Sequence, residues 1–254
     1  MNAIGIIPAR MGSSRFPGKP MKKIHGMPMI GHCYHRTALA HGINATYVAT
    51  CDVEIADYIN SIGGNVVMTA NTHTRATTRT AEALAKIERQ TSKSVDIVVM
   101  VQGDEPLILP KTIAKTIPEF QDNTVDIVNI MSRFPTKDAF EDVNNVKVVV
   151  GNSYDALYFS REPIPSTWQR WDNVPKYMQT GVIAFRRDTL IDFNAMEETQ
   201  LEQIESVDMN RVLETGGKIR MVLTEAITIG VDVPEELMIV EKILTNDKTM
   251  KVYL

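Results

Sequence analysis

Short apolar runs recur along the chain, and stretches with helical spacing of apolar side chains separate them. The clearest runs lie at 3–7, 45–49, 65–68 and 96–101. Runs that are apolar on both faces are typical of parallel strands covered by helices. Helices are expected between them at 28–40, from an N-cap at Asp52 to Gly63, and at 78–89. This alternation predicts an α/β fold built from right-handed βαβ units.

The rhythm changes beyond residue 126. Strands are expected at 126–130, 146–150, 156–160, 181–185 and 218–223, and helices at 204–214 and 234–244. A loop rich in proline and tryptophan, 163–175, interrupts them. No repeat, low-complexity tract or linker divides the chain. We therefore expect a single domain, residues 1–254, with a doubly wound, mostly parallel sheet and a small antiparallel section.

Charge and cysteine content narrow the class of protein. The 254 residues carry 27 Lys and Arg against 31 Asp and Glu, a net charge of -4, which is too balanced to indicate nucleic acid or an anionic membrane as partner. No signal peptide is recognisable, and no apolar run approaches the roughly 20 residues of a membrane span. Two cysteines, Cys33 and Cys51, indicate a reducing compartment. A cytoplasmic protein is expected.

The segment directly after the first strand is the strongest functional signal. Residues 7–20 read IPARMGSSRFPGKP, in which Arg10, Arg15 and Lys19 stand among small residues. Small residues let backbone N–H groups approach phosphate oxygens, and the cations neutralise them. The loop is no Walker A motif, because five residues separate Gly12 from Gly18 and Pro20 replaces the Ser or Thr that binds magnesium. It predicts a phosphate site at the carboxyl edge of the sheet.

Two aspartates follow expected strands. Asp104 stands in VQGDEP after the fourth strand, and Asp232 ends a strand within GVDVPE. Carboxylates in such places suit a hard cation, and a triphosphate needs a metal to bridge it. The alternatives are a solvated turn carboxylate for Asp104 and an N-cap of the helix near Pro234 for Asp232.

Four segments together carry a family resemblance. IPARMGSSRFPGKP, VQGDEP, ALYFSR (156–161) and GVDVPE (230–235) occur in this order. The chain resembles the 3-deoxy-manno-octulosonate cytidylyltransferase family over nearly its whole length. The resemblance implies a nucleotidyltransferase-type fold, a homodimer joined through the antiparallel section, and Mg²⁺ as cofactor. It also implies CTP and an octulosonate sugar acid as substrates, with the CMP-sugar serving lipopolysaccharide biosynthesis.

The same resemblance assigns roles to residues. The nucleotide positions are Ala9, Arg10, Ser14, Arg15, Lys19, Thr77 and Gln102. The sugar-acid positions are Gln102, Arg161, Gln179, Asp208 and Met209. Asp104 and Asp232 hold magnesium and form the catalytic set with Lys19. In the implied reaction the anomeric hydroxyl attacks the α-phosphorus of CTP in line and pyrophosphate leaves, its β,γ-phosphates held by Lys19.

Departures from the family pattern gather at the sugar. The family has Glu, His, Glu and Gln where this chain has Thr78, Gln179, Asp208 and Met209, and the pattern also changes at Arg75 and Ala76. The other nucleotide and metal positions are intact. The sequence therefore favours a modified octulosonate, and the resemblance to relatives that use 8-amino-3,8-dideoxy-manno-octulosonate implies that sugar acid. A neutral Gln179 in place of His avoids a cation beside the substrate ammonium.

Other hypotheses stay open at this point. Drift in an enzyme with the unmodified sugar acid is the main alternative, and a sialic acid is another possible substrate class. A non-catalytic nucleotide-binding regulator could dispense with Asp104 and Asp232, and both are present. Trp168 and Trp171 could cover either the sugar pocket or a second protomer.

Overall fold

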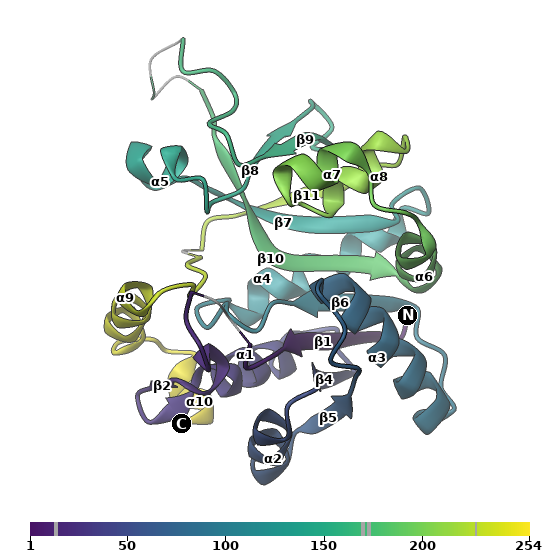
Figure 1. Ribbon diagram of the computed structural model, residues 1–254, viewed down its shortest axis with the longest axis vertical. Coiled ribbons are helices and arrows are strands. Elements are labelled where there is room, and N and C mark those ends of the chain that lie inside the picture. Colours follow the sequence, from purple (N-terminus) through teal and green to yellow (C-terminus); the bar gives the residue numbers. More distant parts are fainter. Residues whose placement is uncertain (13–14, 169–170, 172–173, 227) are drawn as a thin grey trace.

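One twisted sheet runs through the molecule (Figure 1). The computed structural model describes residues 1–12, 15–168, 171, 174–226 and 228–254, and the account below refers to these. Within them the nine strands of the sheet are β1 (Ala3–Ala9), β4 (Ala45–Thr50), β5 (Asn65–Met68), β6 (Ile97–Val101), β7 (Ile127–Arg133), β8 (Lys147–Val150), β9 (Ala156–Ser160), β10 (Tyr177–Arg186) and β11 (Arg220–Thr224). A separate hairpin joins β2 (Lys23–Ile24) and β3 (Met27–Pro28).

The strand order is β11-β7-β10-β6-β1-β4-β5. The pairs β1–β4, β1–β6, β4–β5 and β7–β11 are parallel, whereas β10 is antiparallel to both β6 and β7. Strands β8 and β9 add an antiparallel extension to β10. The predicted α/β fold with a mostly parallel sheet and a small antiparallel section is confirmed.

Helices cover both faces of the sheet, because β1 is apolar on both. Ile4 and Ile6 belong to the same buried cluster as apolar residues of helices α3 (Ala76–Thr91), α6 (Arg187–Ala195) and α8 (Met209–Glu214). Ala3 and Ile7 pack on the opposite side with α1 (Met29–Ala38), α2 (Val53–Ser61) and α4 (Pro110–Ala114). Each fully buried isoleucine stabilises the fold by about 1.5–3 kcal/mol, so alternation along this strand fixes two helical layers. The sheet is therefore doubly wound.

The C-terminal helices form a third cluster beneath the first loop. α9 (Pro234–Leu244) packs against β2, and α10 (Met250–Tyr253) lies on the same side of the molecule in Figure 1. The short helix η1 (Lys19–Met21) precedes β2 in the chain. The apolar residues Val240, Leu244 and Met250 of α9 and α10 pack against Phe16 and Ile24. The remaining elements are α5 (Lys137–Glu141), α7 (Gln200–Glu205) and η2 (Pro118–Gln121).

The prediction of one continuous helix at 204–214 is wrong. The chain forms α7 and α8 instead, broken at Ser206, whose φ of 52° is left-handed. The carbonyl of Glu205 accepts a hydrogen bond from Arg161 Nε at 2.8 Å, so it does not serve a continuing helix. Its carboxylate also accepts from the backbone N–H of Arg161, which directly follows β9. A tertiary contact therefore overrides the local helical pattern.

Strand β10 is longer than the strand expected at 181–185. It begins at Tyr177, where it pairs with β7 on one side and β8 on the other. The loop expected at 163–175 lies partly outside the described residues. Within its described part, Trp171 packs edge-on against Phe140, with ring centroids 5.3 Å apart, and Trp168 is 92% exposed. No helix among the described residues has the length and apolarity to cross a bilayer.

Candidate active site

The loop between β1 and η1 is closed by its own backbone. Gly18 donates its N–H to the Met11 carbonyl at 3.0 Å and has a left-handed φ of 70°, which glycine adopts at little cost. Asp52 holds the loop from the next βα unit, accepting the Met11 N–H at 2.8 Å. Asp52 stands at the N-cap position of α2 as expected, although its carboxylate serves the loop rather than the helix. Ser14, an expected nucleotide contact, lies outside the described residues.

The segment after β6 lies directly against this loop. A Cβ on Gly103 would stand 3.1 Å from the Pro8 carbonyl oxygen, so a larger residue would require the neighbouring backbone to shift by a few tenths of an ångström. The Asp104 carbonyl accepts the Val231 N–H at 2.9 Å and thereby brings in the segment that carries Asp232. The expectation that Asp232 ends a strand is wrong, because residues 228–232 follow β11 without strand pairing.

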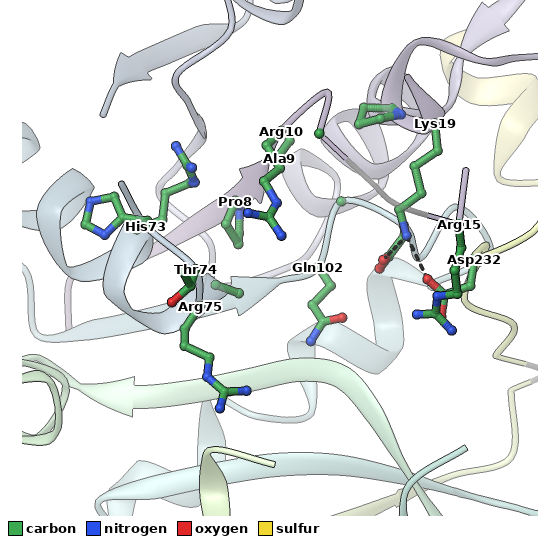
Figure 2. A pocket seen from close by; sticks show the side chains of 16 residues that line it. Pro8, Ala9, Arg10, Arg15, Lys19, His73, Thr74, Arg75, Gln102 and Asp232 are labelled. Carbon is green, nitrogen blue, oxygen red and sulfur yellow. Dashed lines mark hydrogen bonds and ion pairs between the residues drawn. The ribbon is translucent and has the colours of Figure 1, made fainter. Parts of the chain in front are cut away.

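Lys19 joins the two aspartates (Figure 2). Its Nζ lies 2.7 Å from Asp104 Oδ2 and 2.9 Å from Asp232 Oδ1, and it also donates to the Val231 carbonyl at 2.9 Å. Arg15 reaches the other Asp232 oxygen at 2.9 Å. Burial opposes the charge on Lys19, but the two carboxylates outweigh it and raise its pKa. Asp232 is not the N-cap of the helix near Pro234, because Val233 holds the N-cap position of α9.

These residues form one wall of a cavity of about 320 Å³. Its lining residues are Pro8, Ala9, Arg10, Gly12, Arg15, Lys19, Pro20, His73, Thr74, Arg75, Ala76, Arg79, Gln102, Gly103, Asp104 and Asp232. The cationic side chains outnumber the carboxylates, because five arginine and lysine residues face two aspartates. A cavity of this charge is suited to a polyanion. It brings together the predicted residues Ala9, Arg10, Arg15, Lys19, Gln102, Asp104 and Asp232.

The other predicted residues are engaged elsewhere and do not line the described cavity. Thr77 donates to Asp208 Oδ2 at 2.9 Å, and burial raises the pKa of Asp208. Gln179 donates to Asn129 Oδ1 at 2.7 Å. Arg161 donates to the carbonyls of Glu205 and Val143. Met209 is 0% exposed and belongs to the core of the sheet.

Sequence reasoning assigned no site role to the four residues that form one end of the cavity, His73, Thr74, Arg75 and Arg79, and noted Arg75 only as a departure from the family pattern. His73 is fixed there, with Nε2 hydrogen-bonded to Glu82 Oε2 and Nδ1 lying 3.1 Å from Thr78 Oγ1. The available signal was the run of polar residues between the end of β5 and the start of α3. Burial raises the pKa of Glu82, but hydrogen bonds from Lys86, His73 and the Ala70 N–H outweigh it and lower the pKa to about 2.

This pKa makes stability depend on pH. Because the folded-state value lies below the ordinary 4.5, ionised Glu82 stabilises the fold above pH 4.5, and the contribution is lost as pH falls toward 2. We expect Glu82→Gln to lower the free energy of unfolding by about 1 kcal/mol at pH 7, and the deficit to shrink below pH 4.5. Urea unfolding between pH 7 and 3 measures this, with the exposed Glu54→Gln as control. A deficit independent of pH would contradict it.

Glu105 is a second residue that the sequence did not single out. One carboxylate oxygen accepts the Gly181 N–H at 2.9 Å, and the other is buried without a hydrogen-bond partner among the residues that the structure describes. Burial raises the pKa of Glu105 to about 7. The contact joins the segment after β6 to β10, and the Gly181 carbonyl accepts the Gln102 N–H at 2.8 Å. The backbone that carries Gln102 and Asp104 is therefore anchored on the neighbouring strand.

The donor set fits magnesium. Asp104 and Asp232 come from different segments, and both direct an oxygen at the Lys19 ammonium. Mg²⁺ is usually held by one or two carboxylates together with substrate phosphates and water. No group of three or more His, Cys, Asp or Glu side chains suited to a metal occurs in the described part of the chain. A cation here would therefore depend on these two carboxylates and the oxygens of a bound phosphate.

Comparisons with known proteins identify the family. A family model described as cytidylyltransferase matches residues 4–220. A 3-deoxy-manno-octulosonate cytidylyltransferase of Geobacter metallireducens is 41% identical over 96% of this chain and 98% of its own length. An 8-amino-3,8-dideoxy-manno-octulosonate cytidylyltransferase of Shewanella sediminis is 38% identical over 97% of this chain and the whole of its own.

Solved structures show the same fold. A CMP:2-keto-3-deoxy-manno-octonic acid synthetase complexed with CTP superposes with a TM-score of 0.87 at 35% identity, covering 96% of this chain and 99% of the other. A glucose-1-phosphate thymidylyltransferase from Bacillus anthracis shares the fold at 15% identity and a TM-score of 0.69, covering 98% and 99%. The chain belongs to the cytidylyltransferase family and is a nucleotidyltransferase.

Proposed function

We propose that this protein joins CTP to an octulosonate sugar acid, releasing pyrophosphate and forming the CMP-sugar used in lipopolysaccharide biosynthesis. The observation that carries the proposal is the Lys19 ammonium held between Asp104 and Asp232 on the wall of a cationic cavity. The names of the relatives and the CTP complex of the similar structure supply the nucleotide and the substrate class.

The residues of the chain act by positioning and by neutralising charge. Arg10, Arg15 and Lys19 lie on the loop after β1 and take the phosphate oxygens of the nucleotide. Phosphoryl transfer needs little covalent help, so cations fixed before the reaction contribute most of the rate enhancement. The sugar hydroxyl attacks the α-phosphorus in line, while Lys19 holds the leaving β,γ-phosphates. The ion pairs of Lys19 place its ammonium before the nucleotide arrives.

Asp104 and Asp232 are proposed to hold magnesium. When bound, the metal neutralises phosphate charge and lowers the pKa of the attacking hydroxyl. The two carboxylates orient the cation, and Lys19 limits their mutual repulsion. Asp232 also fixes Arg15 at the mouth of the cavity.

Of the two octulosonates, the unmodified 3-deoxy-manno-octulosonate is the substrate we propose. The relatives named for it are 39–41% identical, compared with 37–38% for those named for the 8-amino sugar. Gln179 and Asp208 make internal hydrogen bonds, and Met209 is packed in the core. These contacts support neutral drift at the three positions rather than selection for a different sugar acid. The prediction from the sequence favoured the 8-amino sugar because it assumed that these three residues line the sugar pocket.

The 8-amino sugar acid stays the second candidate. Its supporting observation is Gln179, which places a neutral amide where the family has a titratable His. A terminal ammonium would meet no added cation there.

Competition between the two sugar acids tests this choice. The two sugar acids are supplied at equal concentration, with limiting CTP and an excess of MgCl₂. We expect the CMP derivative of the unmodified sugar acid to exceed the 8-amino product by at least about tenfold, because one hydrogen-bonding mismatch has at least that effect. Separating and counting the products gives the ratio of kcat/KM. An excess of the 8-amino product would reverse the substrate choice. Absence of pyrophosphate release with either acid would support a non-catalytic regulator instead.

Two further properties rest on the resemblance. We propose a homodimer, which light scattering on the purified protein tests, and a cytoplasmic location, where CTP is available. A monomer at micromolar concentration would contradict the first.

A further inference from the structure

We propose that Arg75 determines specificity by binding the carboxylate of the sugar acid. This inference rests on the proposed function, because it concerns the acidic substrate of the same cavity. The resemblance marks Arg75 only as a departure from the family pattern at the nucleotide site, and the mechanism above gives it no role.

Arg75 stands where the cavity meets the second half of the molecule. It occupies the N-cap position of α3, with extended backbone angles of -108° and 146°, and lines the cavity. Its side chain and that of Gln102 extend to the same side in Figure 2, away from Arg10. Arg75 Nη1 lies 3.3 Å from Ser206 Oγ, at the break between α7 and α8. The Arg75 side chain therefore extends from the nucleotide side of the cavity toward the part of the molecule that carries α7.

The contacts of this guanidinium are weak. Its ion pairs with Glu198 and Glu202 are long, at 3.8 Å and 3.9 Å, and the Glu198 side chain is 46% exposed to screening water. Glu202 is already neutralised by Arg211, which donates to both carboxylate oxygens at 2.6 Å and 2.7 Å. Among the described residues, the hydrogen bond to Ser206 is the only one from the five N–H donors of Arg75. Donors thus remain for a ligand.

The other arginines of the region are committed. Arg161 uses Nε and Nη1 on the carbonyls of Glu205 and Val143, at 2.8 Å and 3.0 Å, and does not line the described cavity. Arg79 is buried and donates to Thr69 Oγ1 and the Ala70 carbonyl. The cations of the first loop belong to the phosphates. Arg75 is therefore the described cavity-lining cation that is left for a second anionic group.

The ligand chemistry follows from the shape of the side chain. A planar guanidinium presents paired N–H donors that match two oxygens of a carboxylate or of a phosphate, and the phosphates are assigned above to the cations of the first loop. The sugar acid carries one carboxylate, and the nucleotide carries none. Binding through Arg75 therefore affects the affinity for the sugar acid and leaves that for CTP unchanged.

Steady-state kinetics of Arg75→Ala test the proposal. We expect the KM for the octulosonate to rise by about 10- to 100-fold, the scale of a charge-assisted hydrogen bond, with the KM for CTP within about twofold of wild type. Arg75→Lys keeps the charge but loses the fork, so its KM should fall between the two. An unchanged KM for the sugar acid, or a matching rise in the KM for CTP, would overturn the proposal.

Three controls separate binding from a structural link between α3 and α7. Glu198→Gln breaks the same ion pair but keeps the cation, so the sugar-acid KM should stay the same or fall; a rise like that of Arg75→Ala indicates a structural clasp and refutes binding. Arg133→Ala removes an arginine with a comparably long ion pair to Glu225, 4.0 Å, outside the described cavity, and should change neither KM. The C1 carboxamide of the sugar acid, tested as a competitive inhibitor, should bind wild type and Arg75→Ala alike.

The outcomes also distinguish this inference from the proposed function. If the wild-type protein releases no pyrophosphate from CTP with either octulosonate, the proposed function fails and the role of Arg75 fails with it. If wild type turns over and the variant keeps its sugar-acid KM, only the role of Arg75 is wrong.

Discussion

Asp104→Asn is expected to lower kcat by at least about 10²-fold, equivalent to about 2.7 kcal/mol of transition-state stabilisation. Asparagine keeps the shape of the side chain but removes the charge that faces Lys19 at 2.7 Å. The variant therefore weakens the proposed magnesium site and releases the ammonium from one partner. Asp232→Asn should have a similar effect, because its carboxylate faces the same ammonium at 2.9 Å.

Pyrophosphate release measured across a MgCl₂ titration checks this result. Both variants should need more magnesium for half-maximal rate, and chelation with EDTA should abolish turnover of the wild type. Asp57→Asn, an exposed change on α2, is the matched control and should behave like wild type. Near-normal turnover in both Asp104→Asn and Asp232→Asn would refute the metal assignment.

Lys19→Met should weaken CTP binding and lower kcat together, each by roughly 10-fold or more, so that kcat/KM falls on the order of 10²-fold or more. The side chain retains its length, but the cation that meets the phosphates in the ground and transition states is gone. The change also leaves Asp104 and Asp232 facing each other without the ammonium that separates them. Their repulsion should lower the thermal midpoint, and added MgCl₂ should recover part of the loss by binding the folded state.

Calorimetric CTP titration and thermal unfolding in parallel separate these effects. Lys23→Met removes an exposed lysine from the adjacent β2 and should leave both unchanged. Wild-type CTP affinity and rate in Lys19→Met would show that the loop after β1 does not bind the phosphates.

Local sequence predicted much of the fold because its signals are strong where strands are buried on both sides. Residues 97–101 are all buried in β6, as their continuous apolar pattern indicates. The helix from Asp52 also begins as expected. The prediction failed at 204–214, where Arg161, directly after β9, donates a hydrogen bond to the Glu205 carbonyl. A contact across 44 residues leaves no trace in local periodicity.

The candidate site divides in the same way. Arg10, Arg15 and Lys19 could be found because a short loop after a buried strand must lie at the sheet edge. Arg75 could not be assigned a role, because its proximity to Ser206 depends on how α3 and α7 pack. Met209 was assigned to the sugar pocket by position in a motif, whereas packing against the sheet buries it completely.

By itself the sequence determined the α/β class and predicted the phosphate loop and the aspartates of the proposed site, because buried strands and charged loops follow from neighbouring residues. Only the tertiary structure decided that Lys19 bridges Asp104 and Asp232, through segments 85 and 213 residues away. It also decided that Arg75 faces the cavity while Arg161 serves the backbone of α7. The physical reason is that ion pairs and hydrogen bonds act over a few ångströms in space, and chain folding alone sets which distant residues come within that range.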